Sequence, residues 1–382
     1  MLKSSRIGVL GTLPGQNYQK YLGRNGVTMN KEKILILTDY KGWFWVSVED
    51  LKHYTSMNIQ KLKELFIDYG FEVDILKFSE LDFSRDYRGW YILYQTSEDV
   101  GSFYKDYIED ILLFLEDSGA ILVPKFKYFR AHHNKNYMEM LRYEFKNPQL
   151  KTIQSRFYGN GMDSINEIQN YPVVVKAAEG AGSRYVLGAN TKDELEKDIK
   201  KLSGVFLVNS FKTAKDFYIN YICGSLFGKV QSEYRSYTFF RKKLVVQNMI
   251  EGLSGDYKVL YYGGKYYTLY RKNRENDFRA SGGGRLSQMS VEDSELILKF
   301  AKLVVEEIDA PIIGIDMAFD GIKYHLIEFQ MVHHGPYTLQ ASDGWYEYTE
   351  GGWIHYEGKS NLEAEFARSI AEYIKKTNAL EK

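Results

Sequence analysis

The sequence has little of what marks a secreted, membrane-bound or nucleic-acid-binding protein. Its 382 residues include one cysteine, Cys223, which excludes an internal disulfide framework and fits a reducing compartment. Lys and Arg together number 50, as do Asp and Glu, so no net charge attracts a polyanion. The first apolar run is too short for a signal peptide, and no segment reaches the length of a membrane span. We therefore expect a cytoplasmic protein of two or three subdomains, with no nucleic-acid partner and no membrane span.

The first third of the chain alternates strand-like and helix-like patterns. The strand-like segments are 33–40, 71–78, 87–95 and 120–124, and the helical ones are 59–69 and 104–117. This alternation predicts a small parallel α/β domain. Ligands of such sheets bind at the carboxyl ends of strands, so the loop with Ser97 and Glu98 is a candidate substrate edge. A solvated polar loop is the plainer alternative.

A small-residue loop follows the strand-like segment 171–178. That segment carries Lys176 and leads into the loop Glu179-Gly180-Ala181-Gly182-Ser183. Glycines let backbone amides approach phosphate oxygens, and a lysine on the preceding strand can neutralise their charge. The loop is not a P-loop, because no Gly-Lys-Ser/Thr follows it. By itself the pattern is equally that of a hairpin turn.

A second glycine-bearing segment, 271–286, is strongly cationic. It follows the segments 256–260 and 265–271, which predict a hairpin around Gly263-Gly264. Three consecutive glycines stand among the cations Arg271, Lys272, Arg274, Arg279 and Arg285. Such segments are typical of loops that cover a transferring phosphoryl group, although an exposed basic loop has the same composition.

The most informative segment is 312–330, IIGIDMAFDGIKYHLIEFQ. Two strand-like runs flank the Asp320-Gly321 turn, which predicts a tight hairpin with Asp316 beside Glu328. Because alternate residues share a strand face, Gln330 joins them and completes a row of three oxygen ligands suited to Mg²⁺. Taken alone, the segment also fits a hairpin with acids on a solvated face.

In their order, these blocks over 134–334 resemble the ATP-grasp superfamily of carboxylate–amine ligases, and they are similar to the pattern of its ribosomal-protein glutamate ligases and glutathione synthetases. The resemblance implies an α/β (α+β ATP-grasp) fold, in which two α+β subdomains clamp a nucleotide between antiparallel sheets. It divides the chain into an N-terminal α/β domain (1–130), a central subdomain (131–250, with an insertion at about 204–243) and a C-terminal subdomain (251–382).

The resemblance also implies a role for individual residues. The implied ATP-binding residues are Lys135, Lys176, Glu179, Gly180, Ala181, Gly182, Ser183, Gln247, Asn248, Met249, Ile250 and Asp256. Asp256 is the expected contact of the ribose hydroxyls, with Glu251 as its rival. The implied catalytic cations are Lys258, Arg271, Arg279 and Arg285, and the implied metal ligands are Asp316, Glu328 and Gln330.

Two departures from the superfamily pattern concern the substrate. Gln330 stands where asparagine is usual, and His333 and His334 follow it, so both histidines are candidate substrate contacts together with Ser97 and Glu98. Solvated or structural histidines are the alternative. The insertion, with Arg235 and Arg241, fits an acceptor site, a homodimer contact, a glycan-carrier contact or added packing.

The implied reaction uses ATP and one or two Mg²⁺ ions, with Mn²⁺ as a substitute, to convert a carboxylate into an acyl phosphate that an amine then attacks. The substrates would be small metabolites, amino acids or glycan-linked groups. No covalent nucleophile is required, so Cys223 should be dispensable. Two alternatives remain: a kinase that stops at phosphoryl transfer, and a non-catalytic ATP-binding regulatory protein.

Overall fold

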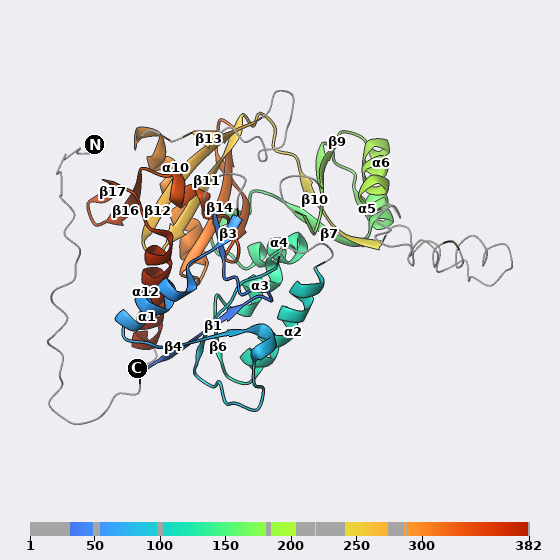
Figure 1. Cartoon of the computed structure of the whole chain (residues 1–382). Helices are drawn as coiled ribbons and strands as arrows, with labels where there is room; N and C mark the ends of the chain where they lie inside the picture. The colour runs from blue at the N-terminus through green and yellow to red at the C-terminus, as the bar shows by residue number, and fades with distance from the viewer. Residues whose placement is uncertain are drawn as a thin grey trace.

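The computed structural model describes residues 31–48, 54–97, 102–180, 185–203, 218, 241–273, 286–287, 289 and 291–380. These residues form three larger sheets and a two-stranded ribbon of β2 (Val46–Val48) and β3 (Tyr54–Ser56). Figure 1 shows the three sheets as separate parts of the molecule, each with its own helices.

The first sheet is parallel, with the strand order β4-β1-β5-β6. Its strands are β1 (Lys33–Thr38), β4 (Glu72–Lys77), β5 (Tyr91–Leu93) and β6 (Ile121–Val123). Ile34 and Ile36 face α1 (Ile59–Asp68), whereas Leu35 and Leu37 face α2 (Phe103–Asp117). This continuous apolar run is typical of a parallel strand covered on both faces. The predicted N-terminal α/β part is therefore confirmed.

The second sheet is antiparallel, with the order β7-β10-β8-β9. Its strands are β7 (Ser155–Asn160), β8 (Val173–Ala177), β9 (Val186–Ala189) and β10 (Arg241–Asn248). Two helices, α5 (Gly161–Glu167) and α6 (Lys192–Ser203), complete its core. In Figure 1 this part stands to the right of the other two, and β10 leads from it to the third sheet.

The third sheet is antiparallel and has the order β15-β14-β11-β12-β16-β17, with β13 (Leu286–Ser287) also paired to β12. Its other strands are β11 (Gly255–Tyr262), β12 (Lys265–Lys272), β14 (Ile312–Phe319), β15 (Tyr324–Gln330), β16 (Gly344–Thr349) and β17 (Gly352–Glu357). One face packs on α10 (Val291–Glu307), and the other packs partly on α12 (Leu362–Leu380). Apart from the two-stranded ribbon, the described residues thus form one parallel and two antiparallel sheets, which confirms the predicted fold class.

The remaining short helices join the parts. They are α3 (Phe126–Ala131), α4 (Lys135–Tyr143), α11 (Tyr337–Ala341), and the 3₁₀ turns η1 (Phe78–Glu80) and η2 (Pro148–Lys151). The apolar side chains of α3 and α4 share a core with the third sheet, and α12 shares one with β1 of the first sheet. The N-terminal and C-terminal parts are thus held by common cores.

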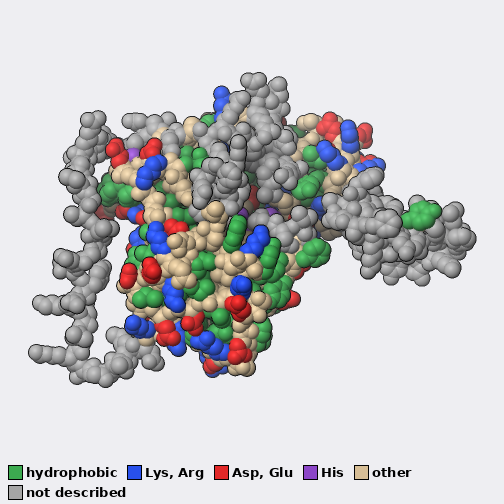
Figure 2. Space-filling view, in the orientation of Figure 1, with side chains coloured by type: hydrophobic (Ala, Val, Ile, Leu, Met, Phe, Trp, Pro, Cys, Tyr) green, Lys and Arg blue, Asp and Glu red, His purple; other side chains and the backbone are tan. Residues whose placement is uncertain are grey.

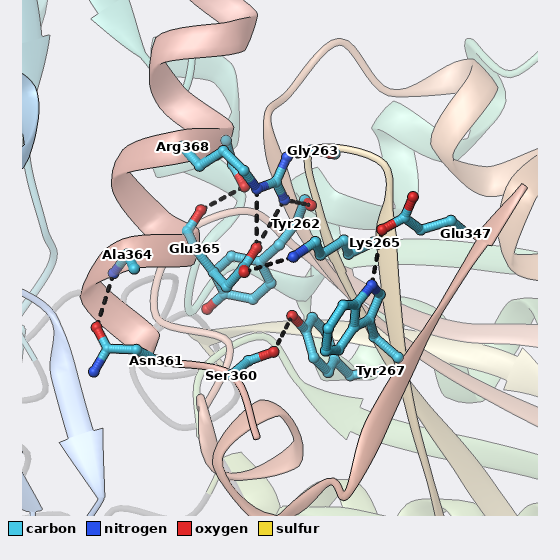
Figure 3. Close-up of polar contacts among 12 residues, drawn as sticks. Tyr262, Gly263, Lys265, Tyr267, Glu347, Ser360, Asn361, Ala364, Glu365 and Arg368 are labelled. Atoms are coloured by element: carbon cyan, nitrogen blue, oxygen red, sulfur yellow. Dashed lines mark hydrogen bonds and ion pairs between the residues drawn. The ribbon is translucent and has the colours of Figure 1, made fainter. Parts of the chain in front are cut away.

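Helix α12 is fastened to the β11–β12 turn by one arginine. Figure 3 shows Arg368 donating to the carbonyl oxygens of Tyr262 and Gly263, both at 2.7 Å, while Glu365 accepts from the same guanidinium. Glu365 also accepts from Lys265 Nζ at 2.7 Å. Charge-assisted hydrogen bonds therefore fix this turn against the helix.

The described helices include none that is both long and apolar enough for a bilayer crossing. On the face in Figure 2, acidic and basic side chains intermingle over the described residues, as the equal numbers of the two charges would suggest.

One difference from the predicted elements concerns the start of β15. The sequence predicts the second hairpin strand from Ile322, but the strand begins at Tyr324. The backbone amides of Ile322 and Lys323 both donate to Asp320 Oδ1 at 2.8 Å, so these two residues belong to the turn.

We expect Gly314→Ala to destabilise the fold by about 1–3 kcal/mol, because an added side chain would overpack the core. A Cβ on Gly314 would lie 2.5 Å from the Cβ of His334, well inside contact distance. Urea unfolding measures the change. Gly159→Ala, in β7, is the matched control, since a Cβ there meets no atom within 4 Å. Equal stability of the two variants would contradict the prediction.

Candidate active site

One face of the third sheet collects the charged residues singled out in the sequence. Asp316 on β14 pairs directly with Glu328 on β15 and with Lys258 on β11. Arg271 on β12 pairs directly with Asp256, two residues before Lys258 on the same strand face. Four adjacent strands therefore present acids and cations side by side.

The cations converge on Asp316. Lys258 Nζ lies 3.1 Å from one of its carboxylate oxygens, and Arg271 Nη2 lies 2.8 Å from the other. Burial alone would raise the pKa of Asp316, but the charges of Arg271 and Lys258 outweigh it and lower the pKa to about 2. The carboxylate is therefore ionised, and 17% of the side chain remains exposed.

Asp256, the expected ribose contact, is buried and paired with Arg271. Only 1% of it is exposed, and its two oxygens accept from Arg271 Nε and Nη2 at 2.7 and 2.5 Å. Burial raises the pKa of this carboxyl, whereas the charge of Arg271 opposes the rise. Both oxygens of Asp256 are thus used in orienting Arg271, and its expected ribose role stays a prediction. Its rival Glu251 is exposed.

Glu328 and Gln330 lie on β15 beside Asp316. Gln330 Nε2 donates to Glu328 Oε1, and a half-turn of the amide would present its oxygen instead. Among the described residues no group of three or more His, Cys, Asp or Glu is placed to hold a metal. Two carboxylates and an amide oxygen nevertheless fit Mg²⁺, which takes hard oxygen ligands and completes its shell with phosphate and water.

Two of the predicted ATP-binding lysines lie outside the third sheet. Lys135 opens α4, where its amide donates to Ala178 O at 3.0 Å and its Nζ to Gly180 O at 2.6 Å. Burial lowers the pKa of Lys176 on β8, whereas the carboxylates of Glu139 and Glu328 oppose the shift. Lys176 of the second sheet therefore lies within electrostatic reach of Glu328 on the third sheet.

Several polar groups of the predicted ATP-binding segment 247–250, called the hinge strand below, form hydrogen bonds within the protein. Gln247 is buried and donates to Ser155 Oγ at 2.8 Å, and Asn248 Oδ1 accepts from the amide of Gln154 at 2.7 Å. The amide of Met249 donates to Pro172 O at 3.2 Å. Ile250, which follows, is partly exposed. The side chains of Gln247 and Asn248 therefore stabilise the strand, and their implied contact with ATP stays a prediction.

The two histidines after β15 have different surroundings. His334 is 3% exposed, its ring lies 5.0 Å from that of Trp45, and its Nε2 is 2.9 Å from the Tyr262 hydroxyl. The His334 side chain therefore packs in the core, and its expected substrate contact stays a prediction. His333 is partly exposed, and its ring lies 6.0 Å from that of His132.

Ser97 lies two residues beyond the buried Gln95, past the carboxyl end of β5, and its carbonyl accepts from the Thr96 hydroxyl at 3.5 Å. Glu179 and Gly180 are described, but several predicted site residues lie outside the described residues: Glu98, Ala181, Gly182, Ser183, Arg279 and Arg285. The same applies to Cys223 and Arg235, and Arg241 is described only as the first residue of β10.

The sequence reasoning missed Glu139 and Arg142 of α4. They form a buried ion pair at 3.0 Å that touches both β7 and β15. A Glu and an Arg three residues apart on a helix are ordinarily an exposed pair, so the spacing carries no sign of burial. The one available signal was their position between two predicted lysine-bearing blocks.

No protein-family model and no curated protein matches the sequence. Similar solved structures include D-cycloserine synthetase, with 11% identity over 89% of this chain and 99% of that one (TM-score 0.47). Another is D-alanine–D-alanine ligase from Bacillus anthracis, with 14% identity over 92% and 100% (TM-score 0.47). A third is a RimK domain ATP-grasp protein from Sphaerobacter thermophilus, with 11% identity over 90% and 99% (TM-score 0.45). The description of the third structure names the superfamily that the sequence resembles. At these identities and TM-scores, structural similarity does not establish substrate or activity.

His334 predicts a pH-dependent stability. Burial lowers its pKa well below the ordinary 6.5, helped by the charges of Lys258, His333 and His132. Below about pH 6.5 the unfolded chain therefore binds one more proton than the folded chain, and this group removes about 1.4 kcal/mol of stability per pH unit. Above that pH it removes none.

Urea unfolding between about pH 7 and about pH 5 measures this slope. We expect His334→Gln to flatten it. Tyr262→Phe, which keeps the imidazole and removes its 2.9 Å partner, should lower stability at every pH by about 1 kcal/mol and leave the slope intact. A slope that survives in His334→Gln would refute the assignment.

Proposed function

We propose that this protein is an ATP-dependent carboxylate–amine ligase that forms an amide or peptide bond through an acyl phosphate. The supporting observation is the row of Arg271, Lys258, Asp316 and Glu328 on one sheet face, with Lys176 within electrostatic reach of Glu328. Phosphoryl transfer needs this combination of cations for phosphate oxygens and carboxylates for a metal.

In the proposed reaction the nucleotide binds between the second and third sheets. Lys135 and Lys176 would neutralise the α- and β-phosphates, the segment Met249–Ile250 would border the base, and Glu251 would accept from the ribose hydroxyls. Glu179 and Gly180 lead into the loop expected at the outer phosphates. Asp316, Glu328 and Gln330 would hold one or two Mg²⁺ ions, which when bound would offset charge on the β- and γ-phosphates.

The cations around Asp316 are suited to the charge that develops during transfer. When a γ-phosphate enters, Lys258 and Arg271 can turn from Asp316 to the phosphate oxygens, while Asp256 keeps Arg271 oriented. The substrate carboxylate then attacks the γ-phosphorus, ADP leaves, and an amine displaces phosphate from the acyl carbon. Arg279 and Arg285 remain candidates for the charge of the tetrahedral intermediate.

The acceptor side is proposed at His333 and at Ser97, which lies past the carboxyl end of β5, with Glu98 as a further candidate from the sequence. His333 is partly exposed and lies three residues beyond Gln330, and an imidazole can take the proton that the attacking amine must lose. We propose small carboxylates and amines as the substrates, glycan-linked ones included.

Release of ADP from purified protein tests the function. With ATP, Mg²⁺ and a panel of carboxylates and amines, we expect ADP release and a product mass equal to both substrates minus water. Glu328→Ala should lower the rate at least about 100-fold, since it removes a ligand of the proposed Mg²⁺ ion that would stabilise charge at the transferred group. Glu357→Ala, on the exposed end of edge strand β17, is the control.

Two outcomes would contradict this proposal. ADP release with a carboxylate alone, and a stable phosphorylated product, would instead identify a kinase. ATP binding without turnover for any pair would favour the regulatory alternative.

Glu251 can be tested separately from Asp256. We expect wild-type protein to bind ATP at least about tenfold more tightly than 2′,3′-dideoxy-ATP, and Glu251→Ala to remove this preference, because a carboxylate–hydroxyl contact contributes roughly 1.5 kcal/mol or more. Calorimetry measures both affinities. Asp256→Asn should instead destabilise the fold while retaining the preference. A preference that persists in Glu251→Ala would exclude the ribose contact.

A further inference from the structure

Helix α4 is the element that touches both sheets of the proposed nucleotide site. Its first residues bind the second sheet: the amide of Lys135 donates to Ala178 O, and Asn136 Nδ2 donates to Leu244 O at 3.3 Å. Its last turn binds the third sheet through Arg142, which donates to the carbonyl oxygens of Leu326 and Ile327. The helix therefore relates the phosphate-facing lysines to the strand that carries Glu328.

Arg142 is fully committed to these contacts. Its guanidinium makes two bonds of 3.0 Å to Glu139, one of 3.3 Å to Leu150 O, one to Leu326 O and one of 3.3 Å to Ile327 O. An arginine has five N–H donors, so each has an acceptor. With 2% of Arg142 and 1% of Glu139 exposed, the pair is held in one geometry.

The two β15 carbonyls that Arg142 binds, those of Leu326 and Ile327, belong to a β-bulge. Asp316 pairs with Glu328, but the next residue, Met317, pairs with Leu326, so Ile327 is an extra residue in β15. β15 is also the edge strand of its sheet, and its outer carbonyls need partners when they are buried. Arg142 supplies those partners immediately before Glu328.

Glu139 extends the same contacts toward the second sheet. Its Oε2 accepts from Ser155 Oγ at 2.9 Å, and Ser155 Oγ accepts from Gln247 on β10. Glu139 also lies near enough to Lys176 to favour the charged lysine. A continuous chain of hydrogen bonds thus runs from the hinge strand to the bulge.

We propose that Arg142, oriented by Glu139, is the positioning residue that holds the β15 bulge and thereby sets Glu328 opposite Asp316 for metal binding. This inference rests on the proposed ATP- and Mg²⁺-dependent function. Outer contacts of a metal ligand typically change metal affinity by about 10–100-fold.

The test compares ATP affinity with Mg²⁺ and with EDTA by calorimetry, in wild-type protein and Arg142→Lys. Lysine keeps the charge beside Glu139, but its single nitrogen cannot reach both carboxylate oxygens and the bulge carbonyls. We expect the gain in affinity that Mg²⁺ provides to shrink about tenfold or more, while affinity in EDTA changes less than about threefold.

Arg368→Lys is the matched control. Arg368 also pairs with a glutamate three residues earlier and also donates to two adjacent backbone carbonyls, those of Tyr262 and Gly263, at the β11–β12 turn (Figure 3). It should lower the melting temperature and leave the Mg²⁺ effect at the wild-type value. Circular dichroism establishes that each variant is folded.

Glu139→Gln is the second variant, in case Arg142→Lys does not fold. It keeps the side-chain shape and an acceptor for Ser155 but loses one charge-assisted pair with Arg142, so the Mg²⁺ effect should again shrink.

Three results overturn the inference. The first is a folded Arg142→Lys or Glu139→Gln variant that keeps the full Mg²⁺ effect, because Arg142 then does not position Glu328. The second is an equal loss of ATP affinity with Mg²⁺ and with EDTA, which marks a purely structural residue. Both leave the proposed function standing. Wild-type protein that binds ATP in neither condition overturns the function and the inference together.

Discussion

The Asp316 carboxylate, shared between Lys258 and Arg271, is the interaction on which the candidate site depends. It joins three strands, since Arg271 comes from β12, Lys258 from β11 and Asp316 from β14. Removing either cation would leave a poorly solvated carboxylate with half of its compensation, and such unbalanced charges are costly. In the proposed reaction, phosphate oxygens would take the place of the Asp316 carboxylate as partners of Lys258 and Arg271. The carboxylate would then be free to bind a metal.

Around this centre the surrounding acids and cations differ in how freely they can change partners. Asp256 is buried and paired on both oxygens, so it acts as the fixed support of Arg271. Glu328 has only the Gln330 amide beside it among the side-chain bonds described, and Asp316 remains partly exposed. On this one sheet face the Asp256–Arg271 pair is therefore the fixed one, whereas Asp316 and Glu328 are partly exposed, which suits a site whose proposed ligands bring their own negative charge.

Much of the fold and part of the site could be predicted from local patterns. The pairing of Asp316 with Glu328 was predicted and is confirmed, but the local pattern does not explain its register. A two-residue turn at Asp320-Gly321 would place Asp316 opposite His325, whereas the longer turn before Tyr324 and the extra residue Ile327 bring Glu328 there. The same reasoning gave no sign that Asp256 supports Arg271 or that His334 is buried. Whether a carboxylate meets a ribose or an arginine depends on the cross-strand neighbour, and whether an imidazole is exposed depends on Trp45, some 290 residues away in the chain.

By itself the sequence determined the order of strands and helices, the fold class, and the residues that carry negative and positive charge in the third sheet. Those features depend on periodicity, turn residues and composition, which neighbouring residues decide. Only the tertiary structure decided which acid supports an arginine, which histidine is buried, and that Arg142 of α4 caps the bulge before Glu328. The reason is physical: burial and long-range hydrogen bonding are set by elements that meet only after the chain has folded, and they change what a side chain is free to bind.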